Sequence, residues 1–159
     1  MSNRELASEI ELTLNQLRDC WNSLALDSIR ELWVKENPEP LYLPEEAGDF
    51  LTSWAAIESY WQTTKDTVSK MRMRVWDLNA RYLEPDLASA WYRMHWNATV
   101  AGYEEPVGGE NRVSALLRRT PDGWRFCQYV EAPLAPMIYL RRLYALDVDA
   151  DFDDQGAAG

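Results

Sequence analysis

The 159-residue sequence has only two cysteines, Cys20 and Cys127, and one histidine, His95. The cysteines lie far apart, and neither belongs to a C-x-x-C pair. This spacing is typical of reduced core thiols in a cytosolic protein, and it argues against a disulfide framework or a zinc site. Any histidine chemistry in this chain must therefore use His95.

The motifs of several large enzyme classes are also missing. The sequence contains no G-x-x-x-x-G-K-S/T phosphate loop, no G-x-G-x-x-G dinucleotide turn and no G-x-S-x-G nucleophile elbow. The pair Gly108-Gly109 stands alone, and it predicts a turn. We therefore expect neither a cofactor nor a metal ion.

Long apolar runs are absent as well. No window approaches the roughly 18 apolar residues that a membrane span needs. The first residues are polar and charged, without the basic and apolar regions of a signal peptide. These features predict a cytoplasmic protein with no membrane partner.

Basic residues are in the minority, with 16 Lys and Arg against 26 Asp and Glu and a net charge of −10. Residues 147–159 contain five aspartates and no basic residue, which predicts a solvated acidic tail after a single domain at 1–146. The rest of the chain is also acidic and shows no basic stripe. This balance argues against nucleic acid or an anionic membrane as a partner.

In contrast, aromatic residues are plentiful, with eight Trp and eight Tyr, and apolar residues recur at helical spacing. Ser2 and Glu5 have capping-box spacing. They precede a stripe that predicts one long amphipathic helix: Leu6, Ile10, Leu14, Leu17, Trp21 and Leu24. We expect Asp27 to cap a second, shorter helix and Thr52 or Ser53 to start a third.

From about residue 68 the pattern changes from helical to extended. Turn signals at 84–86 and 120–123 separate long runs of strand-forming residues. A further helix over 137–146 is expected to close the domain. A run of helices followed by a run of strands predicts an α+β fold, with helices on one face of a mostly antiparallel sheet. The predicted strands are Leu41–Leu43, Lys70–Leu83, Ser89–Ala101, Val113–Arg119 and Trp124–Glu131.

Three segments resemble the nuclear transport factor 2-like superfamily: TSWAAIESYW (52–61), EPDLASAWYRMHW (84–96) and NRVSALLRRTPDGWRFCQYVEAP (111–133). The most specific motif is R-V-x-x-x-L-x-R-x-x-D-G-W, from Arg112 to Trp124. The sequence is most similar to SnoaL-like domains and to bacterial relatives of the association domain of calcium/calmodulin-dependent kinase II. The resemblance implies a cone-shaped curved sheet around a long helix, a pocket at its wide end and a homodimer.

The resemblance does not fix an activity. The superfamily includes isomerases, cyclases, dehydratases and non-catalytic binding modules. The association domain ends its last strand in a His-x-His-Arg pattern, where this chain has Gln128, Tyr129, Val130 and Glu131. A small-anion site built on that arginine is therefore in doubt in this chain.

His95 and Asp77 are the candidate catalytic residues. Strand alternation places His95 on one face with Trp91, Arg93 and Asn97. The resemblance places this stripe towards the pocket, where an imidazole would serve as a general acid or base. The alternative is a structural histidine in a mixed core or at a dimer face.

Asp77 lies on the preceding strand. A carboxylate beside an apolar cavity would have a raised pKa and would abstract a proton from an activated carbon. The alternative is a surface ion pair with a neighbouring arginine. Sequence does not fix the strand register, and a slip of one residue exchanges the two faces.

The candidate ligand-binding residues extend beyond the His95 stripe of Trp91, Arg93 and Asn97. On the last two strands the candidates are Arg112, Tyr129 and Glu131. Arg112 would hold a ligand carboxylate or pair with Glu131, and Tyr129 would donate a hydrogen bond to a ligand or pack in the core. The predicted apolar walls come from the third helix, although an aromatic stripe at helical spacing more often belongs to the core: Trp54, Tyr60 and Trp61.

The leading functional hypothesis is a domain that binds a small hydrophobic ligand in an apolar pocket. The alternatives are a cofactor-independent isomerase, cyclase or dehydratase acting on a small carbonyl compound, with His95 or Asp77 as base, and an oligomerisation module. We also predict a homodimer, because helices cover only one face of a sheet and large apolar residues are expected on both. These residues are Trp76, Leu78, Trp96, Leu117 and Phe126.

Overall fold

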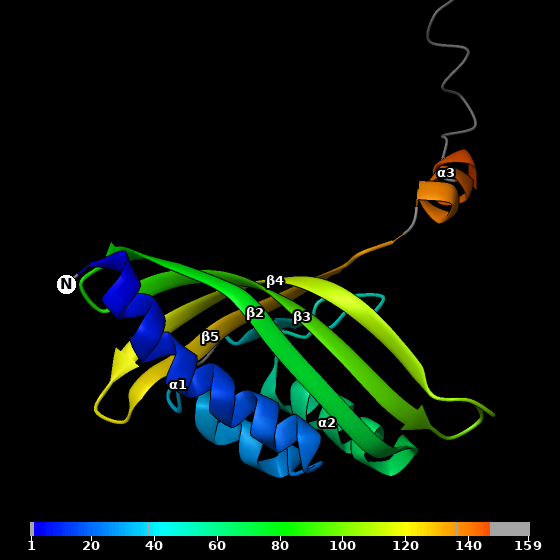
Figure 1. The fold of residues 1–159 in the computed structure, drawn as a ribbon. Helices are drawn as coiled ribbons and strands as arrows, with labels where there is room; N and C mark the ends of the chain where they lie inside the picture. Colours follow the sequence, from blue (N-terminus) through cyan, green and yellow to red (C-terminus); the bar gives the residue numbers. More distant parts are fainter. Residues whose placement is uncertain (1, 38, 136, 147–159) are drawn as a thin grey trace, which may run out of the picture.

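A curved five-stranded sheet with helices on one face forms the body of the protein in the computed structural model (Figure 1). The structure describes residues 2–37, 39–135 and 137–146. The elements follow in the order α1 (Asn3–Asn22), 3₁₀ helix η1 (Leu26–Leu32), β1 (Leu41–Leu43), α2 (Trp54–Thr67), β2 (Val68–Glu84), β3 (Leu87–Val100), β4 (Val107–Thr120), β5 (Gly123–Pro133) and α3 (Met137–Leu146).

The strands lie in the order β1-β5-β4-β3-β2. Strands β2 to β5 form an antiparallel meander, and β1 runs parallel to β5 with Tyr42 opposite Tyr129. Figure 1 shows α1 and α2 on the concave side of the sheet, called the covered face below. The predicted α+β fold and its mostly antiparallel sheet are confirmed.

The first and third predicted helices begin where their caps indicate. The Ser2 N–H donates to Glu5 Oε2 at 2.6 Å, and the Glu5 N–H donates to Ser2 Oγ at 3.3 Å. The Ser53 hydroxyl accepts from the Ala56 N–H at 3.2 Å at the start of α2. The predicted apolar stripe of α1 turns towards the sheet and includes the buried residues Leu6, Ile10, Leu14, Leu17 and Trp21.

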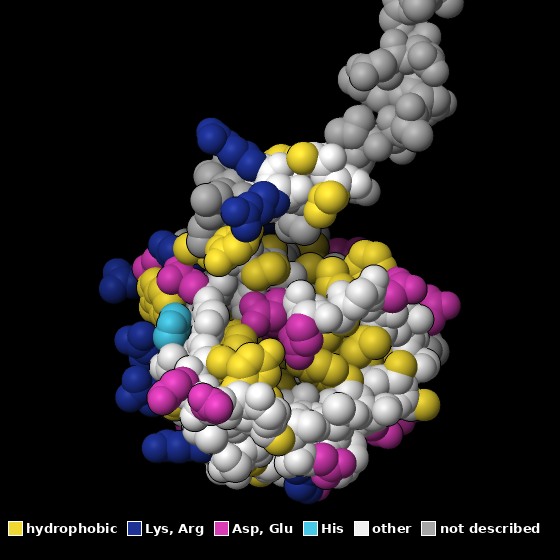
Figure 2. All heavy atoms as spheres, turned by 90° about the vertical axis from the view of Figure 1, so that its right-hand side faces the viewer, with side chains coloured by type: hydrophobic (Ala, Val, Ile, Leu, Met, Phe, Trp, Pro, Cys, Tyr) yellow, Lys and Arg dark blue, Asp and Glu magenta, His cyan; other side chains and the backbone are white. Residues whose placement is uncertain are grey.

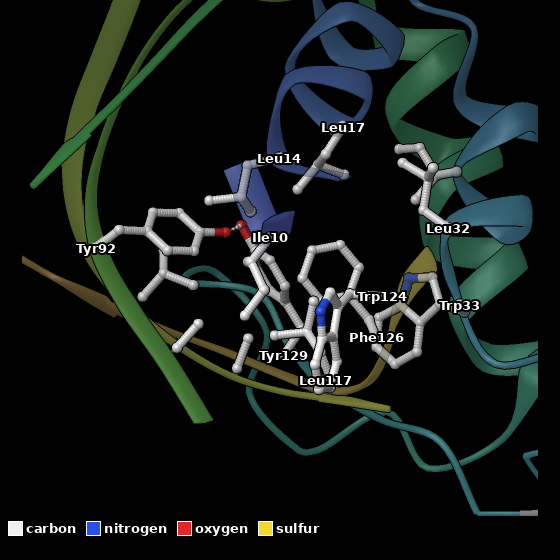
Figure 3. Close-up of a cluster of buried hydrophobic side chains, with 14 of the residues drawn as sticks. Ile10, Leu14, Leu17, Leu32, Trp33, Tyr92, Leu117, Trp124, Phe126 and Tyr129 are labelled. Carbon is white, nitrogen blue, oxygen red and sulfur yellow. Dashed lines mark hydrogen bonds between the residues drawn. The ribbon is translucent and has the colours of Figure 1, made fainter. Parts of the chain in front are cut away.

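The core lies between α1 and the covered face (Figure 3). Aromatic rings meet edge to face there, as in the pair Phe126 and Tyr129, whose centroids are 5.3 Å apart. The Tyr92 hydroxyl donates to the Tyr129 hydroxyl at 2.7 Å. This bond lets two strands bury phenol groups without leaving their oxygens unpaired.

The second predicted helix differs from the prediction in type and in cap. Residues 26–32 form a 3₁₀ helix, and Ala25 rather than Asp27 is the N-cap residue. The Asp27 side chain instead accepts a hydrogen bond from Lys65 of α2 at 2.5 Å. The Asp27 carboxylate therefore forms an ion pair with α2 instead of the predicted helix cap.

Gly108 and Gly109 belong to β4, so the predicted turn at this pair is wrong. A Cβ atom on Gly108 would lie 2.6 Å from Asn97 Nδ2 and 2.7 Å from the Trp96 carbonyl oxygen. Glycine is required here because β3 approaches too closely for any side chain.

The opposite, uncovered face of the sheet is basic, which corrects the expectation of no basic stripe. Residues two apart along a strand share a face, and the strand register aligns such residues in rows across the sheet. Arg93, for example, lies between Trp76 and Arg112. The basic residues on this face are Lys70, Arg72, Arg74, Arg81, Arg93, Arg112, Arg118 and Arg125.

Of the five large apolar residues expected to be divided between the two faces, Trp76 lies on the uncovered face. Trp76 and Trp91 lie on this face, and Trp91 is 42% exposed. The other large residues pack on the covered face: Leu78, Trp96, Leu117 and Phe126. The homodimer remains a prediction.

Residues 137–146 form the predicted helix α3, but this helix does not close the domain. Figure 1 shows it beyond the end of β5 and clear of the sheet. Tyr139 and Tyr144 are 58% and 63% exposed. The predicted acidic tail, 147–159, lies outside the described residues.

Cys20 and Cys127 are both free and half-buried, as expected for core thiols. Burial is the largest influence on each, and it raises the pKa of both thiols above the ordinary value. A thiol with a raised pKa is a poor nucleophile at neutral pH. Neither cysteine therefore suggests a reactive site.

Thr13→Val should destabilise the fold by removing a hydrogen bond between α1 and β5. The buried Thr13 hydroxyl donates to the Trp124 carbonyl oxygen at 2.8 Å. Valine has nearly the same shape but cannot donate this bond. Because the Arg125 guanidinium also donates to that carbonyl at 2.9 Å, the cost should be that of one hydrogen bond, about 0.5–1.5 kcal/mol. Urea unfolding measures the difference. The exposed Thr63→Val in α2 is the control, and equal effects of the two variants would contradict the proposed role of Thr13.

A candidate ligand-binding and proton-transfer site

A cavity of about 350 Å³ lies between the covered face and the segments around α2. Figure 2 looks onto its mouth, where acidic side chains lie in a hollow surrounded by hydrophobic ones. Most of its lining is apolar or aromatic. The lining residues with side chains of those kinds are Trp21, Tyr42, Tyr60, Val68, Met71, Met73, Met94, Trp96, Ala98, Val100, Tyr103 and Val107.

Strand alternation explains which residues reach the cavity. Met94, Trp96 and Ala98 of β3 all line it, whereas the residues between them face the other way. Gly109 of β4 makes room for the Trp96 ring, since a Cβ there would lie 3.2 Å from the indole nitrogen. The glycine pair thus shapes the cavity wall in addition to allowing the strands to approach.

Glu131, near the end of β5, is the most deeply placed carboxyl group of the cavity. Its Oε2 accepts the Glu45 backbone N–H at 3.0 Å, and its Oε1 accepts the Tyr42 hydroxyl at 3.5 Å. Burial raises the pKa of Glu131 to about 8, and the charges of Glu46 and Glu45 also raise it. At neutral pH this carboxyl group is therefore mostly protonated and able to donate a hydrogen bond.

Two further carboxylates, Glu45 and Glu46, line the cavity from the loop between β1 and α2. Burial raises the pKa of Glu45, while hydrogen bonding with Asn111 and Trp96 opposes the shift. Glu46 Oε1 accepts the Tyr60 hydroxyl of α2 at 2.5 Å. The loop therefore brings two acidic groups to the side of Glu131.

The tyrosines of the site act as hydrogen-bond donors. Burial raises the pKa of Tyr42, Tyr60, Tyr92 and Tyr129 well above the ordinary value, and the Glu131 charge also raises all four. These phenols therefore keep their protons throughout the range in which Glu131 titrates. The combination of a titratable acid and fixed donors is suited to binding and polarising a polar ligand group.

The structure does not place His95 in the cavity, which corrects the expected orientation. His95 is paired with Arg74 and Glu110 on the uncovered face. In Figure 2 the single histidine lies beside the basic side chains and outside the hollow. Its Nδ1 atom is buried with no hydrogen-bond partner among the described residues. The apolar stripe of β3, rather than the polar stripe, faces the cavity.

Asp77 also lies away from the cavity. A break in register between Trp76 and Asn79 marks a bulge, and Asp77 has a positive φ of 55° within it. The bulge turns both Val75 and Leu78 to the core side and leaves Asp77 exposed. The expected pairing of His95 and Asp77 at one site is not present.

The polar candidates on the uncovered face do not converge on a ligand site. The Arg81 guanidinium carbon lies 5.7 Å from the centroid of the Trp91 ring, and Arg93 pairs with Glu110. Arg112 donates to the Pro133 carbonyl oxygen at 3.2 Å. Asn97 lies against Gly108. The predicted Arg112–Glu131 ion pair is absent because the two side chains lie on opposite faces.

The aromatic candidates Trp54, Trp61 and Tyr129 do not line the main cavity. Trp54 donates from its indole nitrogen to the Asn37 carbonyl oxygen at 3.0 Å and stacks under Arg30 at 3.4 Å. Trp61 and Tyr129 line a smaller apolar hollow beside the main cavity. Among the predicted binding and wall residues, Glu131 and Tyr60 reach the main cavity.

Sequence reasoning missed Glu45, Glu46 and Tyr42 as site residues. The two glutamates lie in a loop and Tyr42 lies on a three-residue strand, where no residue pattern in the sequence marks a site. A signal for Glu131 did exist, because it follows the buried Tyr129 by two residues and therefore shares its face. An acidic residue in an apolar stripe is informative, since carboxyl groups are seldom buried without a partner.

No cluster of three or more potential ligand residues suitable for a metal ion occurs within the described part of the chain. The described helices also include none that combines the length and hydropathy of a membrane span.

Glu131→Gln should remove a pH-dependent component of stability. Because folding raises the Glu131 pKa from 4.5 to about 8, the folded chain retains a proton that the unfolded chain loses, and the free energy of unfolding falls as pH rises through this window. One such proton gives a slope of at most about 1.4 kcal/mol per pH unit. Urea unfolding at several pH values should show this fall in the wild type and its loss in E131Q.

Tyr60→Phe is the control for this experiment, because it changes the same cavity and leaves Glu131 in place. It should keep the fall in stability with rising pH. A wild-type slope in E131Q would show that another group binds the proton.

Solved structures with the same fold support this architecture. A nuclear transport factor 2-like superfamily protein from Salmonella enterica serovar Typhimurium is 19% identical with a TM-score of 0.71, and the match covers 85% of this chain and 95% of that chain. A candidate dehydratase of the same family from Streptomyces avermitilis is 12% identical with a TM-score of 0.72, covering 85% and 100%. At these identities the likeness shows the fold alone.

A candidate scytalone dehydratase from Novosphingobium aromaticivorans is 8% identical with a TM-score of 0.74, covering 84% of this chain and 87% of that chain. No curated protein matches the sequence. The family model of the SnoaL-like domain matches residues 10–136. The chain therefore belongs to the SnoaL-like family of the nuclear transport factor 2-like superfamily.

Proposed function

We propose that this protein binds a small, mainly apolar ligand in the cavity beside Glu131. The observation that carries the proposal is a cavity of about 350 Å³ with mostly apolar walls and one deeply buried carboxyl group. Small-molecule sites commonly combine such walls with a few polar groups that fix orientation. The ligand's apolar part would contact the methionine and aromatic side chains, and its polar part would reach Glu131.

The lining of the cavity comprises flexible apolar walls and an exposed edge. Met71 and Met73 of β2 and Met94 of β3 form adaptable walls, because methionine side chains are flexible and polarisable. Tyr103 lies at the exposed edge, with 64% of its surface accessible. A ligand entering past Tyr103 would therefore meet the apolar walls together with the acidic side chains at the mouth.

Ala98→Phe should weaken the binding of N-phenyl-1-naphthylamine, a neutral fluorescent probe, by tenfold or more. Ala98 lines the cavity, so a phenyl ring there would fill part of the space that the probe needs. Fluorescence titration measures the dissociation constant. Thr99→Phe is the matched control, because the adjacent Thr99 is exposed on the uncovered face. Equal probe binding in the two variants, with native circular dichroism, would contradict the proposed site.

A second candidate function is proton-transfer catalysis on a small neutral compound, of the isomerase, cyclase or dehydratase type. The specific observation in its favour is the raised pKa of Glu131, about 8, on a group that lines the cavity. A carboxyl group of this kind donates a proton at neutral pH and accepts one at higher pH. Glu131 thereby takes the role first assigned to His95 or Asp77.

Elimination of 5-nitrobenzisoxazole tests Glu131 as a base. Removal of the ring C–H proton breaks the N–O bond and releases a coloured nitrophenolate, with no cofactor required. The rate should rise with pH around a midpoint of about 8, as Glu131 ionises. Glu131→Gln should lower the rate by roughly 10²–10⁴-fold.

Glu84→Gln, at the exposed end of β2, is the control and should keep the wild-type rate. A rate that is the same in E131Q and the wild type would exclude Glu131 as the base. In that case the binding function would stand without this chemistry.

A further inference from the structure

We propose that the ligand of this cavity carries a positively charged amine, held between the cavity carboxyl groups and the surrounding aromatic rings. This inference rests on the proposed binding function and specifies the chemical class of the ligand. It follows from the charges of the lining and from the aromatic groups beside them.

The charges that line the cavity are all of one sign. Glu45, Glu46 and Glu131 contribute carboxyl groups, and no lysine, arginine or histidine occurs among the described residues that line it. Most basic residues of the sheet lie on the other face, and Arg119, which lies on the covered side, pairs with Glu9 of α1 and does not line the cavity. A carboxylate or phosphate ligand would therefore meet like charge without a counterion, whereas a cation would supply the missing partner.

Aromatic side chains accompany these carboxyl groups. Tyr42 and Tyr60 hydrogen-bond to Glu131 and Glu46, so their rings lie next to the acidic groups. Trp96 also lines the cavity and helps to lower the pKa of Glu45, so its indole lies near that carboxylate. The electron-rich faces of Trp and Tyr attract cations, and they recognise alkylammonium groups in cages of this composition.

The groups that face Glu131 make this binding dependent on protons. They are acidic or phenolic on every element packed against it: Tyr42, Glu45, Glu46, Tyr60, Tyr92 and Tyr129. A bound cation would favour the ionised form of Glu131 and lower its pKa. Binding near neutral pH should therefore release a proton from Glu131, and affinity should increase as pH rises towards 8.

Benzyltrimethylammonium tests the proposal, because its charge does not change with pH. Its neutral isostere, neopentylbenzene, has the same shape without the charge. Both compounds are measured by displacement of N-phenyl-1-naphthylamine. The cation should bind at least about tenfold more tightly than the isostere, as expected for a desolvated cation beside aromatic rings and carboxylates.

Calorimetry in two buffers with different ionisation enthalpies measures the proton released when benzyltrimethylammonium binds. Release should be substantial at pH 7 in the wild type and absent in Glu131→Gln. The same variant should lose most of the preference for the cation. Glu45→Gln, which keeps Glu131, should reduce the preference and retain the release, and Glu84→Gln should change neither.

Equal binding of the cation and its isostere would overturn the amine proposal and leave the apolar ligand function intact. Cation binding without proton release, and with no effect of Glu131→Gln, would place the cation away from this site and overturn the proposal too. If the probe, the cation and the isostere all fail to bind, the proposed binding function fails with it.

Discussion

The burial of the Glu131 carboxyl group without a cation is the constraint on which the site depends. Its stabilising contacts are a backbone N–H from Glu45 and the Tyr42 hydroxyl. Both contacts require β1 to run parallel to β5, because the pairing of Leu43 with Val130 brings the chain after β1 alongside Glu131. A three-residue strand therefore holds the loop that both stabilises the carboxyl group and adds two further negative charges to the cavity.

The fold was predictable because its main elements have strong local signals. The capping box and apolar stripe predicted α1, and the proline-glycine turn at 120–123 predicted the β4–β5 hairpin. Features set by contacts between distant segments were not predictable. Asp27 became the partner of Lys65 rather than a helix cap. Gly108 and Gly109 of β4 are glycines because β3 and the Trp96 ring approach them closely. Turns also favour glycine, so the sequence alone could not distinguish the two cases.

The site was harder to predict, since it depends on which face of each strand the helices cover. The alternation along β3 was correct, but the polar stripe containing His95 faces away from the helices. For Asp77 the bulge between Trp76 and Asn79 reversed the alternation within a single strand. Glu131 was among the predicted ligand residues, yet its pairing was wrong because Arg112 lies on the other face. Local patterns identified the polar residues, and the strand faces decided which of them meet.

This same alternation separates the charges of the sheet. Basic residues occupy the uncovered face, where water screens them, while Glu131 lies behind the sheet in the cavity. The Glu131 pKa is set by burial and by three neighbouring residues, Glu45, Glu46 and Tyr42, all on the cavity side. Arginines such as Arg93 and Arg112 therefore offer the cavity no effective counterion, although they belong to neighbouring strands. The Glu131 carboxyl group can remain buried in two states: protonated, or ionised beside a positively charged ligand. The two states differ by one proton, which a binding experiment can measure.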